Sequence, residues 1–183
     1  MIVLGLDISS TTIGYAVLRD GKIHDYGHGQ LSGTIAARCE TAAFLAGTLL
    51  DGHQPALVVI ESPVARFAKA VIPQARVSGA VLAVLGQRNA LWEEVAPSVA
   101  KKVLAGCGDA NKIQMLDAAA QRAGIGEDVR CYTHKGKRQA YRGDEVLMTE
   151  DEADAIGVAF AGAALRVVVK GDVARVAAEY LNE

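Results

Sequence analysis

The sequence predicts a mixed α/β fold, on three observations. Short apolar runs at residues 1–7 and 56–61 have the length and composition of buried strands. An Asp-Gly dipeptide separates residues 12–18 from residues 22–31, which is typical of a tight β-hairpin. Apolar residues from position 35 to 49 recur at helical spacing. Because strands alternate with helices after the hairpin, we expect a mixed sheet with helices packed against it.

Local signals mark the ends of the first elements. Thr34 can cap the first helix, and Gly52 is expected to end it. Pro55 precedes the fourth strand, and a helical region follows at about 66–87, interrupted near Pro73. A short fifth strand is expected at about 90–95.

The second half of the chain alternates helices with breaks. Pro97 can begin a helix, a glycine-containing break follows at 106–108, and Asp109 is expected to cap the next helix to about residue 123. Residues 124–148 are expected to be irregular or hairpin-like. Thr149 and Glu152 have the spacing of a capping box at the start of a last long helix. No linker divides the chain, so residues 1–183 are expected to form one domain.

Four carboxylates stand where apolar elements end or begin. Asp7 ends the first strand and Glu61 ends the fourth, while Asp151 and Asp154 share one face at the start of the last helix. Small residues continue that face, so the helix can lie close to the sheet and bring Asp154 within reach of Asp7. Each acid alone also has a structural role as an alternative. Carboxylates brought together repel one another unless a cation lies between them, so their joint placement predicts a divalent metal site.

Charge is segregated along the chain, although the formal net charge is only −2. No acid lies between Glu61 and Glu93, five basic residues and no acid lie in 130–142, and six acids lie in 144–154. This pattern fits basic surfaces around an acidic metal pocket, as in a nuclease, although alternating solvated faces are the plainer interpretation.

Three acidic blocks and a basic block together resemble the RuvC-type Holliday junction resolvases. The acidic blocks are 5–16, 59–61 and 151–155, the fourth block is 99–112, and Gln74-Ala75-Arg76 with Gly79 is similar to the helix after the second acid. The first block alone is weak, because actin-like ATPases and sugar kinases share it. The set, in this order over about residues 1–165, is more specific.

The resemblance implies an RNase H-like fold with a five-stranded mixed sheet and helices on both faces. It also implies a homodimer that nicks four-way DNA junctions symmetrically and leaves 5′-phosphate ends, in DNA recombination and repair. Two magnesium ions per active site, which manganese is expected to replace, would be held by the catalytic residues Asp7, Glu61, Asp151 and Asp154. The apolar helix segment 77–85 is a candidate contributor to the dimer.

Several further residues are expected to contact DNA. Lys101 and Lys112 would meet phosphates, with Lys112 near the scissile one, and Lys102 is either a third contact or a solvated lysine. Phe67 is the nearest aromatic to the position after the second acid where the family often has a Phe, although it can equally belong to the core. The remaining expected DNA contacts are Arg76, Arg130, Lys135, Lys137, Arg138 and Arg142.

The segment at about 128–147 is expected to be a basic inserted hairpin or loop, because typical members of the family are short here. Tyr132 and Tyr141 are interleaved with its basic residues, which favours DNA contact over a solvated loop. Insertions of this kind resemble viral or phage members of the family.

Composition narrows the alternatives. Three cysteines without metal-ligand spacing, and no apolar run long enough to span a bilayer, predict a cytoplasmic protein of a bacterial or phage-infected cell with no membrane contact. At 183 residues the chain is too short for an actin-like ATPase. A nuclease for other branched DNA or RNA–DNA hybrid, and a non-catalytic junction-binding module, stay open as alternatives.

Overall fold

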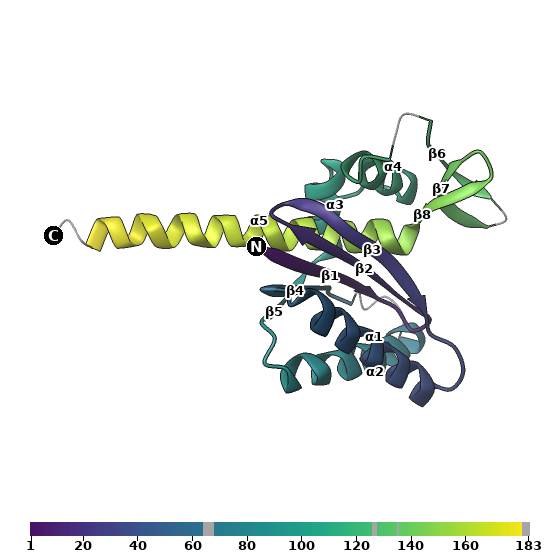
Figure 1. The fold of residues 1–183 in the computed structure, drawn as a ribbon, viewed down its shortest axis with the longest axis horizontal. Coiled ribbons are helices and arrows are strands. Elements are labelled where there is room, and N and C mark those ends of the chain that lie inside the picture. Colours follow the sequence, from purple (N-terminus) through teal and green to yellow (C-terminus); the bar gives the residue numbers. More distant parts are fainter. Residues whose placement is uncertain (64–67, 126–127, 135, 181–183) are drawn as a thin grey trace.

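A five-stranded sheet lies between two helical layers, and a small second sheet stands beside the first turn of the last helix (Figure 1). The computed structural model describes residues 1–63, 68–125, 128–134 and 136–180, with side chains as far as residue 165 apart from 68–70. The strands of the main sheet, in spatial order, are β3 (Lys22–Gln30), β2 (Thr12–Arg19), β1 (Ile2–Ile8), β4 (Leu57–Glu61) and β5 (Trp92–Val95). The expected RNase H-like arrangement, a five-stranded mixed sheet with helices on both faces, is confirmed.

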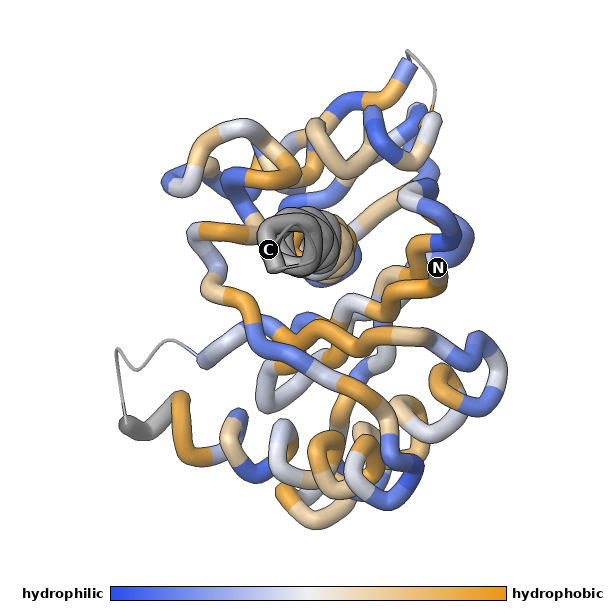
Figure 2. Tube along the Cα trace, turned by 90° about the vertical axis from the view of Figure 1, so that its left-hand side faces the viewer, coloured by the Kyte–Doolittle hydropathy of each residue, from blue (hydrophilic) through white to orange (hydrophobic). Residues whose placement is uncertain are grey.

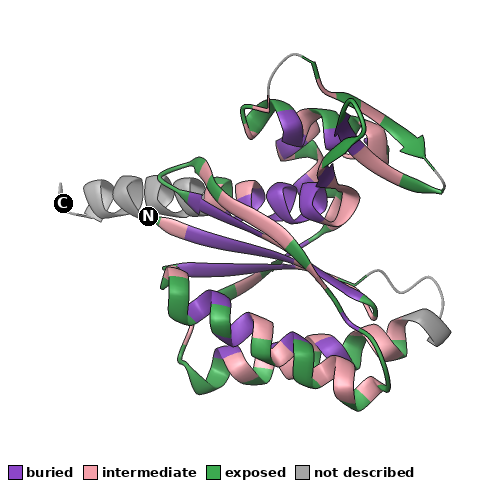
Figure 3. Cartoon of the chain, turned by 45° about the vertical axis from the view of Figure 1, so that its right-hand side comes forward, coloured by how far each residue is buried: buried purple, intermediate pink, exposed green. Residues whose placement is uncertain are grey.

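Helices α1 (Ile35–His53) and α2 (Ala68–Gln87) cover one face of the sheet. Helices α3 (Pro97–Ala105), α4 (Lys112–Arg122) and α5 (Glu150–Tyr180) cover the other. The central strands are largely hydrophobic (Figure 2) and buried (Figure 3), and buried apolar residues of both helical layers belong to the same core clusters. In the described part of the chain, no helix is both long and apolar enough to cross a membrane.

The alternation of side chains along β1 and β4 decides which face each acid occupies. Leu4 and Leu6 pack toward α1 and α2, whereas Val3 packs toward α5. Since side chains alternate across a strand, Asp7 shares the face of Val3, and Glu61 by the same rule shares the face of Val59. Both acids therefore face the layer that contains α5.

Helix α5 lies unusually close to the sheet because three glycines leave room for it. A Cβ on Gly5 would lie 2.5 Å from the Ala155 carbonyl oxygen and 2.5 Å from the Ala159 amide nitrogen. A Cβ on Gly14 would lie 2.3 Å from the Asp151 carbonyl oxygen, and one on Gly162 would lie 2.1 Å from a Val59 methyl group. The expected close approach of this helix to the sheet is thus confirmed.

The residues expected to limit several elements are partly corrected. Helix α1 continues through Gly52 to His53 and ends with Gln54 in the left-handed conformation. Helix α2 runs through Pro73 without a break.

The cap expected at Asp109 is wrong. Asn111 caps α4 instead: its side chain accepts hydrogen bonds from the amides of Ile113 and Gln114, and its own backbone amide donates one to Gln114 Oε1. The Asp109 carboxylate instead accepts a hydrogen bond from the Cys107 thiol.

The segment expected to be irregular or hairpin-like forms a second, antiparallel sheet. Its strands are β6 (Arg130–His134), β7 (Lys137–Arg142) and β8 (Glu145–Thr149). Ala140 and Met148 are fully buried in the same core cluster as Met115 and Leu116 of α4. The segment is thus part of the core and not a detachable loop.

We expect Gly5→Ala to destabilise the protein by several kcal/mol, about 2–4, because its methyl group would collide with backbone atoms of α5 that cannot move without lifting the helix. Chemical denaturation measures the change. Gly79→Ala is the matched control: apart from its own stretch of α2, no described atom lies within 4 Å of its Cβ position. It should stabilise the protein slightly, since alanine favours a helix. Equal losses in the two variants would contradict the close approach.

Candidate active site

Asp7 and Glu61 lie next to each other at one end of the main sheet. Strands β1 and β4 are parallel and pair Leu6 with Ile60, so the next residue of each strand is an acid. Both acids face α5, as the alternation above requires. Gln74 of α2 donates a hydrogen bond of 2.8 Å to the Ile8 carbonyl oxygen and so fixes the end of β1 from the opposite face.

The first turn of α5 supplies two more carboxylates. A capping box holds this turn: the Thr149 amide donates to Glu152 Oε2 at 2.6 Å, and the Glu152 amide donates to Thr149 Oγ1 at 3.4 Å. The cap expected from the sequence is confirmed. It sets the start of the helix, and thereby the positions of Asp151 and of Asp154, which is buried.

The four acids act on one another electrostatically. Burial raises the pKa of Asp7 well above its usual value, and the charges of Glu61, Asp154 and Asp151 raise it further. Burial and the charge of Asp154 raise the pKa of Glu61 from 4.5 to about 7. Burial, followed by the charge of Glu150, also raises the pKa of Asp151. These shifts are those of like charges gathered in a poorly solvated place.

Lys112, the first residue of α4, puts a positive charge among these acids. Its Nζ contacts Asp154 Oδ2 and lies 4.0 Å from Glu150 Oε2. Burial works against the charged form of Lys112, but the charges of Asp154, Asp7 and Glu150 outweigh it and raise the pKa. The charge of Lys112 also offsets part of the rise in the pKa values of Asp7, Glu61 and Asp151. One lysine therefore interacts with all four carboxylates.

The donor set fits a hard divalent cation. Carboxylate oxygens from two strand ends and one helix are the ligands that magnesium prefers. Within the described ranges, no group of three or more acidic, histidine or cysteine side chains converges closely enough to hold an ion as it stands. Asp154 is turned to Lys112, so the lysine already provides part of the charge compensation that the acids require.

The other expected DNA contacts lie at different distances from the acids. Lys101 of α3 lies near Glu61, since its charge lowers the pKa of that acid. Lys102 is exposed on the same helix, and Arg76 is exposed on α2, on the opposite face of the sheet. Phe67 and Lys135 are outside the described residues.

The second sheet connects to the site through Arg138. Its Nη1 lies 3.3 Å from Glu150 Oε2, the oxygen that Lys112 also approaches. Lys137 precedes it on β7 and is exposed.

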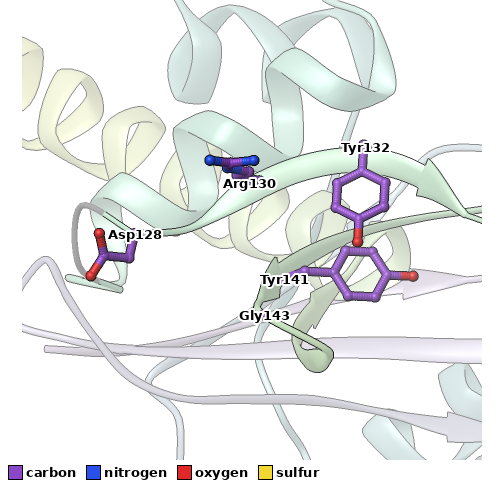
Figure 4. A pocket seen from close by; sticks show the side chains of 5 residues that line it. All are labelled: Asp128, Arg130, Tyr132, Tyr141 and Gly143. Carbon is purple, nitrogen blue, oxygen red and sulfur yellow. The ribbon is translucent and has the colours of Figure 1, made fainter.

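Arg130 and Arg142 lie at the other end of this sheet, away from Arg138. Arg130 lines a pocket of about 560 Å³, together with Tyr132 and Tyr141 (Figure 4). The two tyrosine rings stack with their centroids 4.5 Å apart. Arg142 is exposed at the end of β7.

Two contributors to the site were not predicted. Glu150 joins Lys112 to Arg138, and its only signal in the sequence is its place in an acidic run. His28 of β3 lies 2.8 Å through Nδ1 from Glu152 Oε1 and so ties the cap of α5 to the main sheet. No motif marks His28, because its partner is 124 residues away.

Known proteins share both the sequence and the fold. The family described as crossover junction endodeoxyribonuclease RuvC matches residues 3–127. The RuvC crossover junction endodeoxyribonuclease of Chlamydia pneumoniae is 30% identical over 122 residues, which cover 62% of this chain and 73% of that protein.

Among solved structures, Thermus thermophilus RuvC in complex with a Holliday junction substrate matches at a TM-score of 0.71 and 20% identity. That match covers 89% of this chain and 93% of the other. The yeast mitochondrial Holliday junction resolvase Ydc2 matches at 0.58 and 15% identity, over 87% of this chain and 76% of that one. The family match ends at residue 127, before the second sheet and α5. The two structural matches cover more of the chain than the family match does. With its acids at the ends of β1 and β4 and on α5, the chain belongs to the RuvC family of crossover junction endodeoxyribonucleases.

Proposed function

We propose that Asp7, Glu61, Asp151 and Asp154 bind two magnesium ions and that the chain uses them to nick four-way DNA junctions symmetrically, leaving 5′-phosphate ends. Family membership makes the chain a Holliday junction resolvase. The observation that carries the metal proposal is the mutual raising of carboxylate pKa values where three elements meet. Such a cluster favours cation binding, because each bound charge relieves the repulsion.

Bound at these acids, magnesium would supply an activated water and stabilise the leaving oxygen, and manganese is expected to replace it. The chain's own residues position the phosphate. Lys112 can neutralise a phosphate oxygen beside Asp154, and Lys101 can do the same beside Glu61. Both lysines thereby favour a DNA backbone at the acids without reading its bases.

Further basic residues are proposed to hold the arms of the junction. Lys102 and Arg76 are exposed on α3 and α2, and Arg130 and Arg142 are exposed at the far end of the second sheet. Phosphate contacts of this kind supply affinity that does not depend on sequence and that falls with salt. The Holliday junction bound by Thermus thermophilus RuvC supports a branched substrate for this chain as well.

We also propose that the chain acts as a homodimer, since two symmetric nicks need two active sites. In segment 77–85, Val77, Val81 and Leu85 are fully buried in the monomer's own core, so only its other apolar side chains, which are partly or fully exposed, stay available for the dimer contact expected from the sequence. The helical layer of α1 and α2 also exposes Phe44, at 75%, and Ile72, at 54%. These side chains are the better candidates for the dimer contact.

We expect Asp154→Asn to slow junction cutting by about 100-fold or more while junction binding persists, because it removes a metal ligand and leaves the basic surfaces intact. A labelled four-way junction, a fork, a linear duplex and an RNA–DNA hybrid, each with and without magnesium, measure both. Glu40→Gln, an exposed acid on α1, is the control and should cut normally. Normal cutting by Asp154→Asn would refute the metal assignment, and preferential cutting of the hybrid would refute the junction as substrate.

We expect the metal-free protein to lose stability as pH rises from about 4.5 to 7. A carboxyl whose folded pKa is raised, as for Glu61, contributes stability that is present at low pH and is lost as the group ionises. Glu61→Gln should therefore be more stable than the wild type at pH 8, by about 1–3 kcal/mol after solvent screening. Denaturation in EDTA across this range measures the difference.

Asp51→Asn is the control of opposite sign, because the hydrogen bond from Arg88 lowers the pKa of Asp51. It should not gain stability at pH 8. If Glu61→Gln gained none either, the four acids would not repel one another as proposed.

We expect the wild-type mass in solution to be about twice 19.2 kDa. Phe44→Ser should weaken the dimer, whereas Leu91→Ser, which removes another exposed apolar side chain outside this helical layer, should not. Analytical ultracentrifugation over a range of concentrations distinguishes them. A wild type that stays monomeric, or equal effects of the two variants, would refute the proposed contact.

A further inference from the structure

We propose that the groove between the main sheet and the second sheet binds a single DNA strand next to the scissile phosphate, with Lys137 and Arg138 contacting its backbone. The groove has a volume of about 390 Å³. His28 and Gln30 of β3 line it from the main sheet, Lys137, Arg138 and Gln139 of β7 line it from the second sheet, and Asp151 of α5 also lines it. This inference rests on the proposed function, because it takes Asp151 to be part of the metal site.

The groove is continuous with the four acids through charged contacts. Arg138 lies 3.3 Å from Glu150, Lys112 lies 4.0 Å from the same carboxylate oxygen, and Lys112 also contacts Asp154. A strand held in the groove would therefore lead directly to the place where the phosphate is cut. The pocket around Arg130 lies at the other end of the second sheet and lacks this connection (Figure 4).

The chemistry of the groove favours a sugar–phosphate backbone. Lys137 is exposed, and none of the carboxylates that the structure describes lies within salt-bridge distance of it. The amides of Gln30 and Gln139 can donate further hydrogen bonds, and the charge of Glu150 is already compensated by Arg138 and Lys112. The stacked tyrosines of the second sheet do not line the groove. Backbone contacts from cations and amides therefore outweigh base stacking here.

The size of the groove favours one strand over a duplex. Its volume is in the range of pockets that enclose a single small ligand, and a nucleotide is of that size. A volume of this size matches the backbone of one strand and not the full cross-section of a B-DNA duplex, whose major groove alone is about 12 Å wide. At the centre of a junction each crossing strand passes from one duplex arm to another, and the groove takes the backbone of one such strand.

The walls of the groove are held in place by the core. Ala140 and Met148 of the second sheet are fully buried against α4. The Tyr26 hydroxyl of β3 donates a hydrogen bond of 3.3 Å to the Leu147 carbonyl oxygen of β8 and so links the two sheets directly. A site on packed strands is positioned more precisely than one on a loop, which suits a groove that must place a phosphate.

Junction binding by the Asp154→Asn protein tests the assignment without cutting. Adding Lys137→Ala and Arg138→Ala should weaken binding roughly tenfold or more, and should reduce the slope of log affinity against log salt by about 1.4, or 0.7 for each single-strand phosphate contact. The matched control adds Arg19→Ala and Lys22→Ala, which remove one arginine and one lysine from the opposite end of the main sheet. Lys137→Ala alone leaves the Arg138–Glu150 ion pair intact, so we expect it to weaken junction binding, but less than the double substitution does.

Neutral methylphosphonates locate the strand. They are placed one at a time beside the scissile phosphate, and at one or two positions they should weaken junction binding by the Asp154→Asn protein. At those positions they should weaken binding little further when Lys137 and Arg138 are already replaced by alanine. Equal effects of the groove variant and its control, or additive losses at every position, would overturn the groove assignment. An Asp154→Asn protein without preference for the junction over linear duplex would instead overturn the proposed function, and the groove assignment with it.

Discussion

The close approach of α5 to the main sheet is the constraint on which the rest of the structure depends. Because Gly5, Gly14 and Gly162 have no side chains, α5 packs directly against strands β1, β2 and β4. The first turn of α5 therefore lies over the ends of β1 and β4. The capping box at Thr149 and Glu152 sets where that turn begins. A helix lifted by the thickness of one methyl group would separate the acids of α5 from those of the sheet. Backbone packing thus decides the geometry of the site before any side chain is placed.

Bringing four acids together has a cost that the fold offsets only in part. Burial and mutual repulsion raise the pKa values of Asp7, Glu61 and Asp151, so their ionised forms destabilise the folded chain. The contact of Lys112 with Asp154 offsets part of this destabilisation. The remaining repulsion is what a divalent cation can relieve. Strain of this kind at a functional site is compensated elsewhere, here by two well-packed core clusters on either side of the sheet.

The second sheet extends the site and is not an appendage to it. It shares the core of α4, is hydrogen-bonded to β3, and reaches the acids through Arg138 and Glu150. The family match ends at residue 127, before the first strand of this sheet. Its basic residues divide into two groups, with Lys137 and Arg138 beside the acids and Arg130 and Arg142 at the far end. The two ends can therefore serve different parts of a branched substrate.

By itself the sequence determined the strands of the main sheet, most of the helices and the two caps at Thr34 and Thr149, because each depends on neighbours within a few positions. The tertiary structure alone decided that Lys112 contacts Asp154, that His28 supports Glu152, and that Glu150 joins Arg138 to the site. It also decided that Val77, Val81 and Leu85 are core residues. Each of these outcomes depends on residues far apart in the chain, whose distance is set by how helices and sheets pack and is not encoded in any local pattern.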